Sequence, residues 1–148
     1  MKVKYLEKFY VAGITTRTNN KIELDETTAQ IPQLWQRYVD ENIESKTFNK
    51  SRNLAMYGVY NKYEKDVNSD YDYTIGVEVT KFKNAITIEK DRYLVFSKKG
   101  EFPKVVIETW HEVWNYFASQ ECKYERVYNF DFEKYLKNDE MEIYISIK

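Results

Sequence analysis

The same order of predicted elements runs twice along the chain, and this constrains the fold more than any other feature. Each passage contains one amphipathic helix that begins close to a proline, Pro32 or Pro103. Proline is tolerated in the first turn of a helix, where its missing N–H has no partner to lose. Thr27 and Thr28 are the expected caps of the first helix. The apolar residues that define the two helical faces recur at steps of three and four: Ile31, Leu34, Trp35, Tyr38 and Val39, then Val106, Trp110, Val113, Trp114 and Phe117.

Strands are predicted for most of the remaining chain. Residues 9–18 are rich in β-forming side chains, and the apolar residues of 71–79 alternate with polar or small ones. Strict alternation is typical of a half-buried strand. Shorter strands are expected at 57–60, 93–96, 125–128 and 142–147.

The two passages align with each other. Three pairs of segments carry the alignment: 75–79 with 143–147 and 57–60 with 125–128 at an offset of 68, and 34–38 with 113–117 at an offset of 79. The alignment pairs Trp35 with Trp114 and Tyr57 with Glu125. We interpret the chain as a duplicated strand–helix–strand–strand (βαββ) unit and expect an α+β fold with pseudo-twofold symmetry, antiparallel sheets and two main helices. The sheet faces opposite the helices would flank a central ligand groove.

Length and composition agree with one domain. The 148 residues are the usual size of a single domain, here residues 1–148 with halves at roughly 1–83 and 84–148. Aromatic residues make up 17% of the chain, which excludes a disordered protein despite 32% charged residues. No apolar run reaches the length of a membrane span, and the N-terminus lacks the apolar stretch of a signal peptide. The single cysteine, Cys122, excludes an internal disulfide and favours a cytoplasmic location.

The sequence lacks the motifs that are typical of several classes of chemistry. The four glycines are isolated, so the chain contains no phosphate-binding loop and no dinucleotide-binding fingerprint. His111 and Cys122 do not have the spacing of metal ligands. We therefore expect no metal and no other cofactor. A net charge of −1 argues against binding of nucleic acid over a broad surface, and no membrane partner is expected.

Aromatic side chains dominate the candidate site. A core of this size does not need 14 tyrosines, because each buried hydroxyl requires a partner. A ring-lined cavity that contains one carboxylate suits flat, apolar cations, which it would hold by stacking, cation–π attraction and charge pairing. We expect some of the strand aromatics to line such a cavity or the surface, and the candidates are Tyr57, Tyr60, Tyr71, Tyr73, Tyr93 and Phe96.

Carboxylates inside predicted strands are the candidates for the acidic residue. Glu78, Glu125 and Glu142 have this position. A carboxylate buried without a partner costs several kcal/mol, so each needs a salt bridge, an exposed edge or a function. Asp131 and Glu133 are interpreted instead as part of a charged strand edge or turn.

Motifs from both halves resemble the GyrI-like family, the effector-binding domain of bacterial transcription activators. The match covers essentially the whole chain and points to the stand-alone, integron-associated effector-binding proteins. The motifs that carry it are Ala12-Gly13-Ile14-Thr15-Thr16-Arg17-Thr18-Asn19-Asn20, Ile31-Pro32-x-Leu34-Trp35, Tyr57-Gly58-Val59-Tyr60, Tyr71-x-Tyr73-x-Ile75-Gly76-x-Glu78-Val79, Trp110 to Trp114, Glu125-Arg126-x-Tyr128-x-x-Asp131-Phe132-Glu133-x-Tyr135 and Glu142-Ile143-Tyr144-Ile145-x-Ile147.

The resemblance implies two βαββ units and a central pocket for hydrophobic, often cationic, small molecules. In multidrug-binding members an acidic pocket residue meets the positive charge, and by motif and position Glu125 matches it. Tyr57 is its counterpart in the first half and matches a pocket tyrosine. Trp110, Tyr73 and Phe96 are ligand-binding candidates by region.

Three functional interpretations remain after this resemblance, since a fold alone does not determine function. The favoured one is a binding protein for small aromatic or cationic compounds, with no catalytic residue assigned. The alternatives are a small hydrolase that acts on reactive natural products with a pocket Glu and Tyr, and an interaction protein whose partner is DNA gyrase or a regulator. In the family's regulators a DNA-binding helix-turn-helix region precedes the domain, whereas residue 1 here opens the first strand. We therefore expect no direct contact with nucleic acid.

Overall fold

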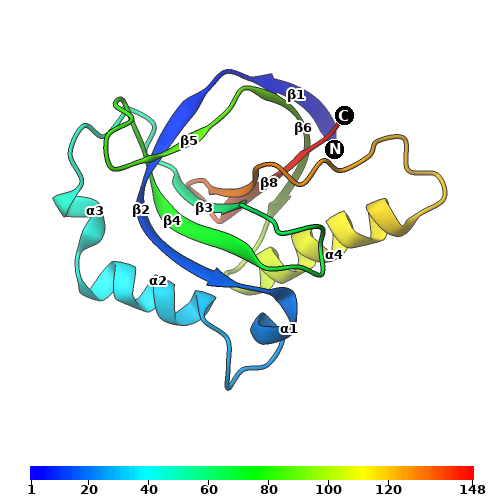
Figure 1. The fold of residues 1–148 in the computed structure, drawn as a ribbon, viewed down its shortest axis with the longest axis horizontal. Helices are drawn as coiled ribbons and strands as arrows, with labels where there is room; N and C mark the ends of the chain where they lie inside the picture. The colour runs from blue at the N-terminus through cyan, green and yellow to red at the C-terminus, as the bar shows by residue number, and fades with distance from the viewer.

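The computed structural model describes residues 1–148, which form one curled antiparallel sheet with helices packed on one face (Figure 1). The strands lie in the order β1-β6-β8-β7-β3-β4-β2-β5. None of the helices has the length and apolar character needed to cross a membrane. The elements are β1 (Lys2–Leu6), β2 (Phe9–Thr18), α1 (Asn20–Glu23), α2 (Ile31–Asp40), α3 (Ile43–Lys46), β3 (Met56–Asn61), β4 (Tyr71–Val79), β5 (Ile86–Ile88), β6 (Asp91–Lys99), α4 (Lys104–Ala118), β7 (Asp131–Tyr135) and β8 (Glu140–Ser146).

Two equivalent halves meet in the middle of the sheet, where β3 pairs with β7. The first half consists of β2, α2, β3 and β4, and the second of β6, α4, β7 and β8. Helix α2 packs on β2 and β4, and α4 packs on β6 and β8. The remaining strands cross over, since β1 pairs with β6 and β5 pairs with β2. The prediction of an α+β fold with two βαββ units is confirmed.

The strand register changes the alignment of the halves. Gly58 pairs with Glu133 across the central β3–β7 ladder. Ile75 pairs with Gly58, and Ile143 pairs with Glu133. With Ile75 taken as the counterpart of Ile143, at the predicted offset of 68, the registers make Gly58 the counterpart of Glu133, at an offset of 75. The loop between β3 and β4 is longer than the loop between β7 and β8, so the predicted offset of 68 does not hold for both pairs of strands.

The strand predicted at 125–128 is wrong. Only Arg126 makes an isolated bridge there, to Ile147. Tyr128 has a φ of 56°, in the left-handed region, so its backbone cannot continue an extended strand. The central strand of the second half is β7 instead.

The helices begin where the prolines predicted them. Pro32 lies in the first turn of α2, and Pro103 is the N-cap residue of α4. Trp114 departs from the expected buried stripe, because it is 40% exposed. The helix residues that are buried are Leu34 and Tyr38 in α2 and Val105, Thr109 and Val113 in α4.

An apolar core fills the face of the sheet that is turned away from the helices. Phe132 and Tyr144 stack within it, with ring centroids 4.4 Å apart. Successive residues of a strand point to opposite faces, so Phe132 in this core directs Glu133 to the face that carries the helices. The buried members of this core are Val11, Ala55, Tyr57, Val59, Ile88, Tyr93, Val95, Phe132 and Tyr144.

Glu23, at the end of α1, caps the N-terminus of α2. Its carboxylate accepts the backbone N–H of Gln30 at 3.0 Å and that of Ile31 at 2.9 Å. Thr27 and Thr28, the expected caps, do not reach these groups. The Thr27 hydroxyl donates to the side chain of Asp25, and the Thr28 hydroxyl donates to backbone carbonyls of the preceding turn.

A Glu23→Ala variant is expected to lose about 1 kcal/mol of unfolding free energy, because two N–H groups of the first turn lose their acceptor. Urea denaturation measures this loss as a lower midpoint at unchanged slope. The matched control is Glu26→Ala, an exposed acidic residue of the same segment, which should change stability by less than about 0.5 kcal/mol. Equal effects of the two variants would contradict the capping role.

Candidate functional site

A buried carboxylate, Glu133 on β7, accepts four hydrogen bonds from aromatic side chains. Its Oε1 accepts the hydroxyls of Tyr73 at 2.8 Å and Tyr135 at 2.7 Å. Its Oε2 accepts the hydroxyl of Tyr60 at 2.9 Å and the indole N–H of Trp110 at 2.8 Å. Glu133 is 2% exposed and forms no ion pair. These five residues are called the Glu133 cluster below.

Both halves of the fold build the cluster. Tyr60 and Tyr73 come from β3 and β4 of the first half, and Trp110 comes from α4 of the second. Gly58, directly opposite Glu133, leaves the necessary space. A Cβ at this position would overlap the Tyr73 hydroxyl and the Glu133 carboxylate. The cluster therefore depends on a glycine at one particular point of the ladder.

A tryptophan from each main helix reaches the cluster. Trp35 of α2 donates its indole N–H to the Tyr73 hydroxyl at 3.1 Å, and its ring lies 5.4 Å from that of Tyr135. Trp110 of α4 donates to Glu133 in a similar way. Trp114, which the sequence paired with Trp35, lies farther out and packs against Trp110 at 6.0 Å. By contacts, the counterpart of Trp35 is Trp110.

Burial keeps the three cluster tyrosines protonated. It raises the pKa values of Tyr60, Tyr73 and Tyr135 well above the ordinary value of 10.0, and the negative charge of Glu133 raises them further. The three hydroxyls therefore remain hydrogen-bond donors to the carboxylate at neutral pH.

High pH is expected to destabilise the protein through these tyrosines. Their contribution to stability is complete below pH 10. It is lost as the pH rises above that value, because the unfolded chain then releases protons that the folded chain retains. Tyrosinate absorbance and circular dichroism, followed together as the pH rises, should show these tyrosines ionising only when the protein unfolds. Ionisation of all 14 tyrosines in a protein that remains folded would contradict this prediction.

Two of the five ligand-binding candidates lie in the Glu133 cluster, namely Tyr73 and Trp110. Tyr57 lies on the opposite face of the sheet, where it is 3% exposed and packs against Phe132. Phe96 is buried beneath α4. The cluster lies on the face that carries the helices, whereas the sequence placed the groove on the other face.

Glu125, the expected acidic residue, lies at the surface. Its side chain is 69% exposed and pairs with Lys148 at 2.7 Å. Two carboxylates are buried, Asp131 and Glu133, and the sequence assigned both to a charged edge or turn. Asp131 pairs with Arg126, whereas Glu133 forms no ion pair. In the sequence, the apolar residue Phe132 followed by Glu133 and Tyr135 could have indicated this site. It does so only when the loop between the last two strands of the second half is taken to be shorter than its counterpart in the first half.

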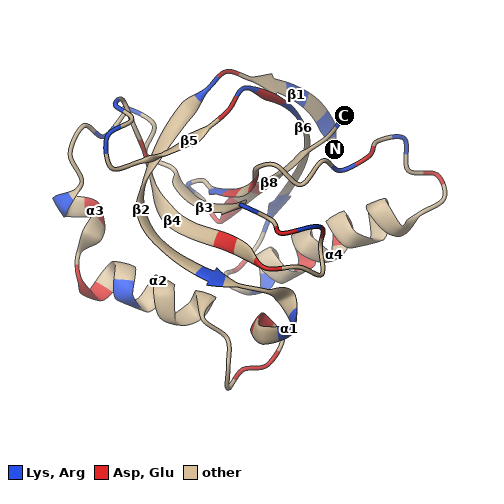
Figure 2. Ribbon diagram, in the orientation of Figure 1, with Lys and Arg blue, Asp and Glu red and all other residues tan.

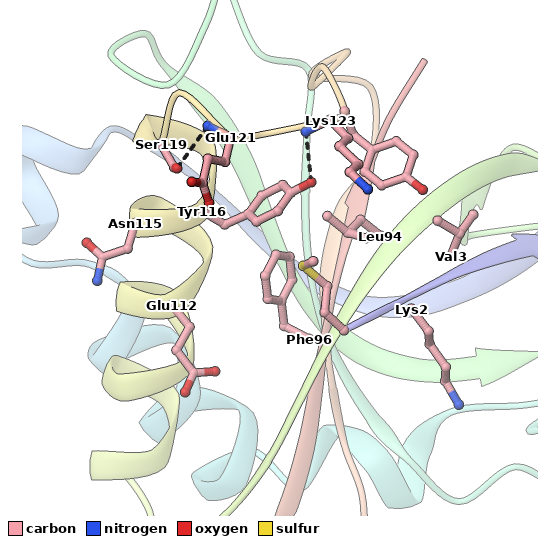
Figure 3. Close-up of a pocket in the computed structure, with 12 residues that line it drawn as sticks. Lys2, Val3, Leu94, Phe96, Glu112, Asn115, Tyr116, Ser119, Glu121 and Lys123 are labelled. Atoms are coloured by element: carbon pink, nitrogen blue, oxygen red, sulfur yellow. Dashed lines mark hydrogen bonds between the residues drawn. The ribbon is translucent and has the colours of Figure 1, made fainter.

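An open cavity of about 770 Å³ lies apart from the cluster, between the end of α4 and strands β1 and β6 (Figure 3). Phe96 and Leu94 contribute from β6, and Tyr116 contributes from α4. The Tyr116 hydroxyl accepts the backbone N–H of Lys123, which holds the loop after α4 over the cavity. Phe96 therefore faces this cavity and not the buried carboxylate.

The sequence of this chain also matches the model of a known family. The sequence model of the integron-associated effector binding proteins, Cass2, matches residues 2–147. The chain belongs to this family. Membership places it among effector-binding proteins and supports small-molecule binding as its general function.

Known Cass2 relatives and structural neighbours match over nearly the whole chain. The integron cassette protein VCH_CASS2, from the mobile metagenome of Vibrio cholerae, is 32% identical with a TM-score of 0.87, over 99% of this chain and 95% of the other. YobU of Bacillus subtilis (strain 168), described as a transcriptional regulator, is 25% identical over 99% of this chain and 96% of its own length. SAV2435, solved with bound tetraphenylphosphonium, has the same fold, with 22% identity and a TM-score of 0.77 over 99% and 93% of the two chains.

Proposed function

We propose that this protein binds hydrophobic aromatic cations at the Glu133 cluster. The observation that carries the proposal is a carboxylate that is 2% exposed and has no cationic side chain as a partner. Burial of a carboxylate without an opposite charge is unfavourable, and the four donors offset only part of this cost. A bound cation supplies the missing positive charge in surroundings where charges attract more strongly than in water.

The rings around Glu133 supply the apolar contacts. Tyr60 and Trp110 meet edge to face, with centroids 5.3 Å apart. Trp114 and Phe102 extend the aromatic surface outward and are 40% and 41% exposed. An aromatic cation can stack on these rings, and its charge is attracted to their faces.

The hydrogen bonds of Glu133 favour cations that donate no hydrogen bond themselves. A carboxylate has about four lone-pair sites, and four donors already occupy those of Glu133. A primary ammonium group would have to displace one of them. A cation shielded by phenyl groups needs no such contact, and tetraphenylphosphonium, the compound bound to SAV2435, is of this kind.

Thermal unfolding with matched probes tests the proposal. Tetraphenylphosphonium and tetraphenylborate have the same shape and opposite charge. The cation should stabilise the protein by about 2.7 kcal/mol at a hundredfold excess over its Kd, and the anion should have no comparable effect. Equal stabilisation by both would show that the rings alone bind the probe. No stabilisation by the cation would contradict the proposed function.

A further inference from the structure

A basic and aromatic surface lies on two loops outside the Glu133 cluster. One part comprises the last residue of α3 and the loop that leads to β3, and the other is the loop that joins β4 to β5. Figure 2 shows Lys and Arg gathered on both, at the corner of the sheet beside β5. We call this surface the loop patch; its residues are Lys46, Phe48, Lys50, Arg52, Lys81, Phe82 and Lys83.

Backbone contacts hold the two loops together. The carbonyl of Asn49 accepts the N–H of Thr80 at 2.9 Å, and the Thr80 hydroxyl donates to the same oxygen at 3.3 Å. Lys50 and Val79 form an antiparallel bridge beside them. The loop patch is therefore one continuous surface, although its two parts are some 30 positions apart in sequence.

The charges of the loop patch have no charged partners within the chain, and the Lys50 ammonium group donates only to the backbone carbonyl of Glu44 at 3.3 Å. None of its five cationic side chains forms an ion pair, whereas Lys98, Arg126 and Lys148 elsewhere do. The whole protein has a net charge of −1, so this positive surface is a local feature. It matches an anionic partner by charge.

Two phenylalanines stand among these cations. Phe48 is 86% exposed and Phe82 is 72% exposed. Phe82 has one aromatic neighbour, Tyr10, at 6.5 Å. Two rings this exposed, each flanked in sequence by lysines and carried on loops joined by a backbone hydrogen bond, mark an interaction surface, since isolated exposed apolar residues are the ordinary case.

We propose that the loop patch docks the protein on an anionic lipid bilayer, with Phe48 and Phe82 in the interfacial region and the basic side chains at the lipid phosphates. This replaces the expectation of no membrane partner, and it is independent of ligand binding at Glu133. Lysine can keep its ammonium group in water while its stem lies along apolar material, and each basic residue near an anionic surface strengthens binding.

The form of the loop patch favours a bilayer over other anionic partners. Both loops project outward beside β5 (Figure 1), and a flat bilayer needs no matching groove. Single-stranded nucleic acid is usually held in a basic groove that tracks its backbone. Four of the five cations are lysines. An ammonium group acts as a point charge, whereas the planar guanidinium group of arginine binds one phosphate or carboxylate with two hydrogen bonds. The loop patch is therefore suited to an anionic surface and less suited to one defined phosphate or carboxylate group.

Vesicle co-sedimentation tests this proposal. The protein should sediment with vesicles of phosphatidylcholine mixed with phosphatidylglycerol and not with phosphatidylcholine alone, and added salt should weaken the binding. Lys81→Gln with Lys83→Gln should weaken it by roughly 25-fold, at about fivefold for each lysine. Phe48→Ala with Phe82→Ala should also weaken binding, in a way that is insensitive to salt.

Control variants distinguish vesicle binding by the loop patch from nonspecific adsorption of the protein. Leu24, 81% exposed, and Lys65 lie outside the loop patch, and Leu24→Ala with Lys65→Gln should bind as the wild type does. Thermal unfolding verifies that each variant is folded. Absence of binding to the mixed vesicles, or equal losses in the control variant, would overturn the proposal. So would tighter binding to a single-stranded oligonucleotide or to polyglutamate that the same loop-patch variants abolish.

Discussion

A Glu133→Gln variant is expected to bind tetraphenylphosphonium roughly 5- to 150-fold more weakly than the wild type. Glutamine keeps the shape of the side chain and its place on β7 but removes the charge. The loss corresponds to about 1–3 kcal/mol, the range of a charge-assisted contact. Isothermal titration with the cation measures it, and titration with tetraphenylborate shows whether the apolar contacts survive, since the anion should bind no more weakly to the variant.

Glu125→Gln is the matched control. It makes the same chemical change at a carboxylate whose side chain is 69% exposed and paired with Lys148. Its affinity for the cation should stay within about twofold of the wild type, because solvent screens exposed charges. A loss at Glu125 with none at Glu133 would place the binding site at the surface and contradict the assignment to β7.

An Asp131→Ala variant should lose about 3–5 kcal/mol of unfolding free energy. Asp131 is fully buried and pairs with Arg126 at 2.8 Å. It also accepts the N–H and hydroxyl of Ser146 at 2.8 and 3.1 Å and the hydroxyl of Tyr63 at 2.7 Å. Removal of one member of a buried pair leaves the other uncompensated, and the Arg126 side chain is only 8% exposed. Chemical denaturation measures the loss.

Two comparisons make this second prediction specific. Glu125→Ala breaks the exposed pair with Lys148 and should cost no more than about 1 kcal/mol. Removing both buried charges, by Asp131→Leu with Arg126→Met, should recover part of the loss because no charge is left unpaired. A loss below about 1 kcal/mol for Asp131→Ala would contradict the role assigned to the buried pair, which anchors the loop entering β7.

Local signals predicted most of the fold. The apolar steps of three and four, with a proline at each start, located α2 and α4, because a helix of this kind is defined by one face and its first turn. Alternation located β2 and β4 for the same reason. The duplication followed from the order of these elements, and the structure confirms it.

Two of the predicted ligand-binding residues lie in the Glu133 cluster. Tyr73 and Trp110 were expected near a ligand, since a core this size cannot easily satisfy so many hydroxyl-bearing rings. The family resemblance predicts the acidic residue at Glu125 by motif and position, and the alignment of the halves uses the same offset of 68 for both pairs of strands. The structure has two offsets, and this difference moves the counterpart of the β3 strand from Glu125 to the segment containing Glu133.

The sequence by itself determined the elements, their order and their pairing into two halves, because each depends on neighbours within a few residues. Only the tertiary structure decided that the buried carboxylates are Asp131 and Glu133. The length of the loop between β7 and β8 sets the strand register, and Phe132 in the apolar core turns Glu133 toward the helices. Gly58 then leaves space for its carboxylate, and four donors from β3, β4, β7 and α4 converge on it. These contacts join residues far apart in the chain, so no local pattern contains them.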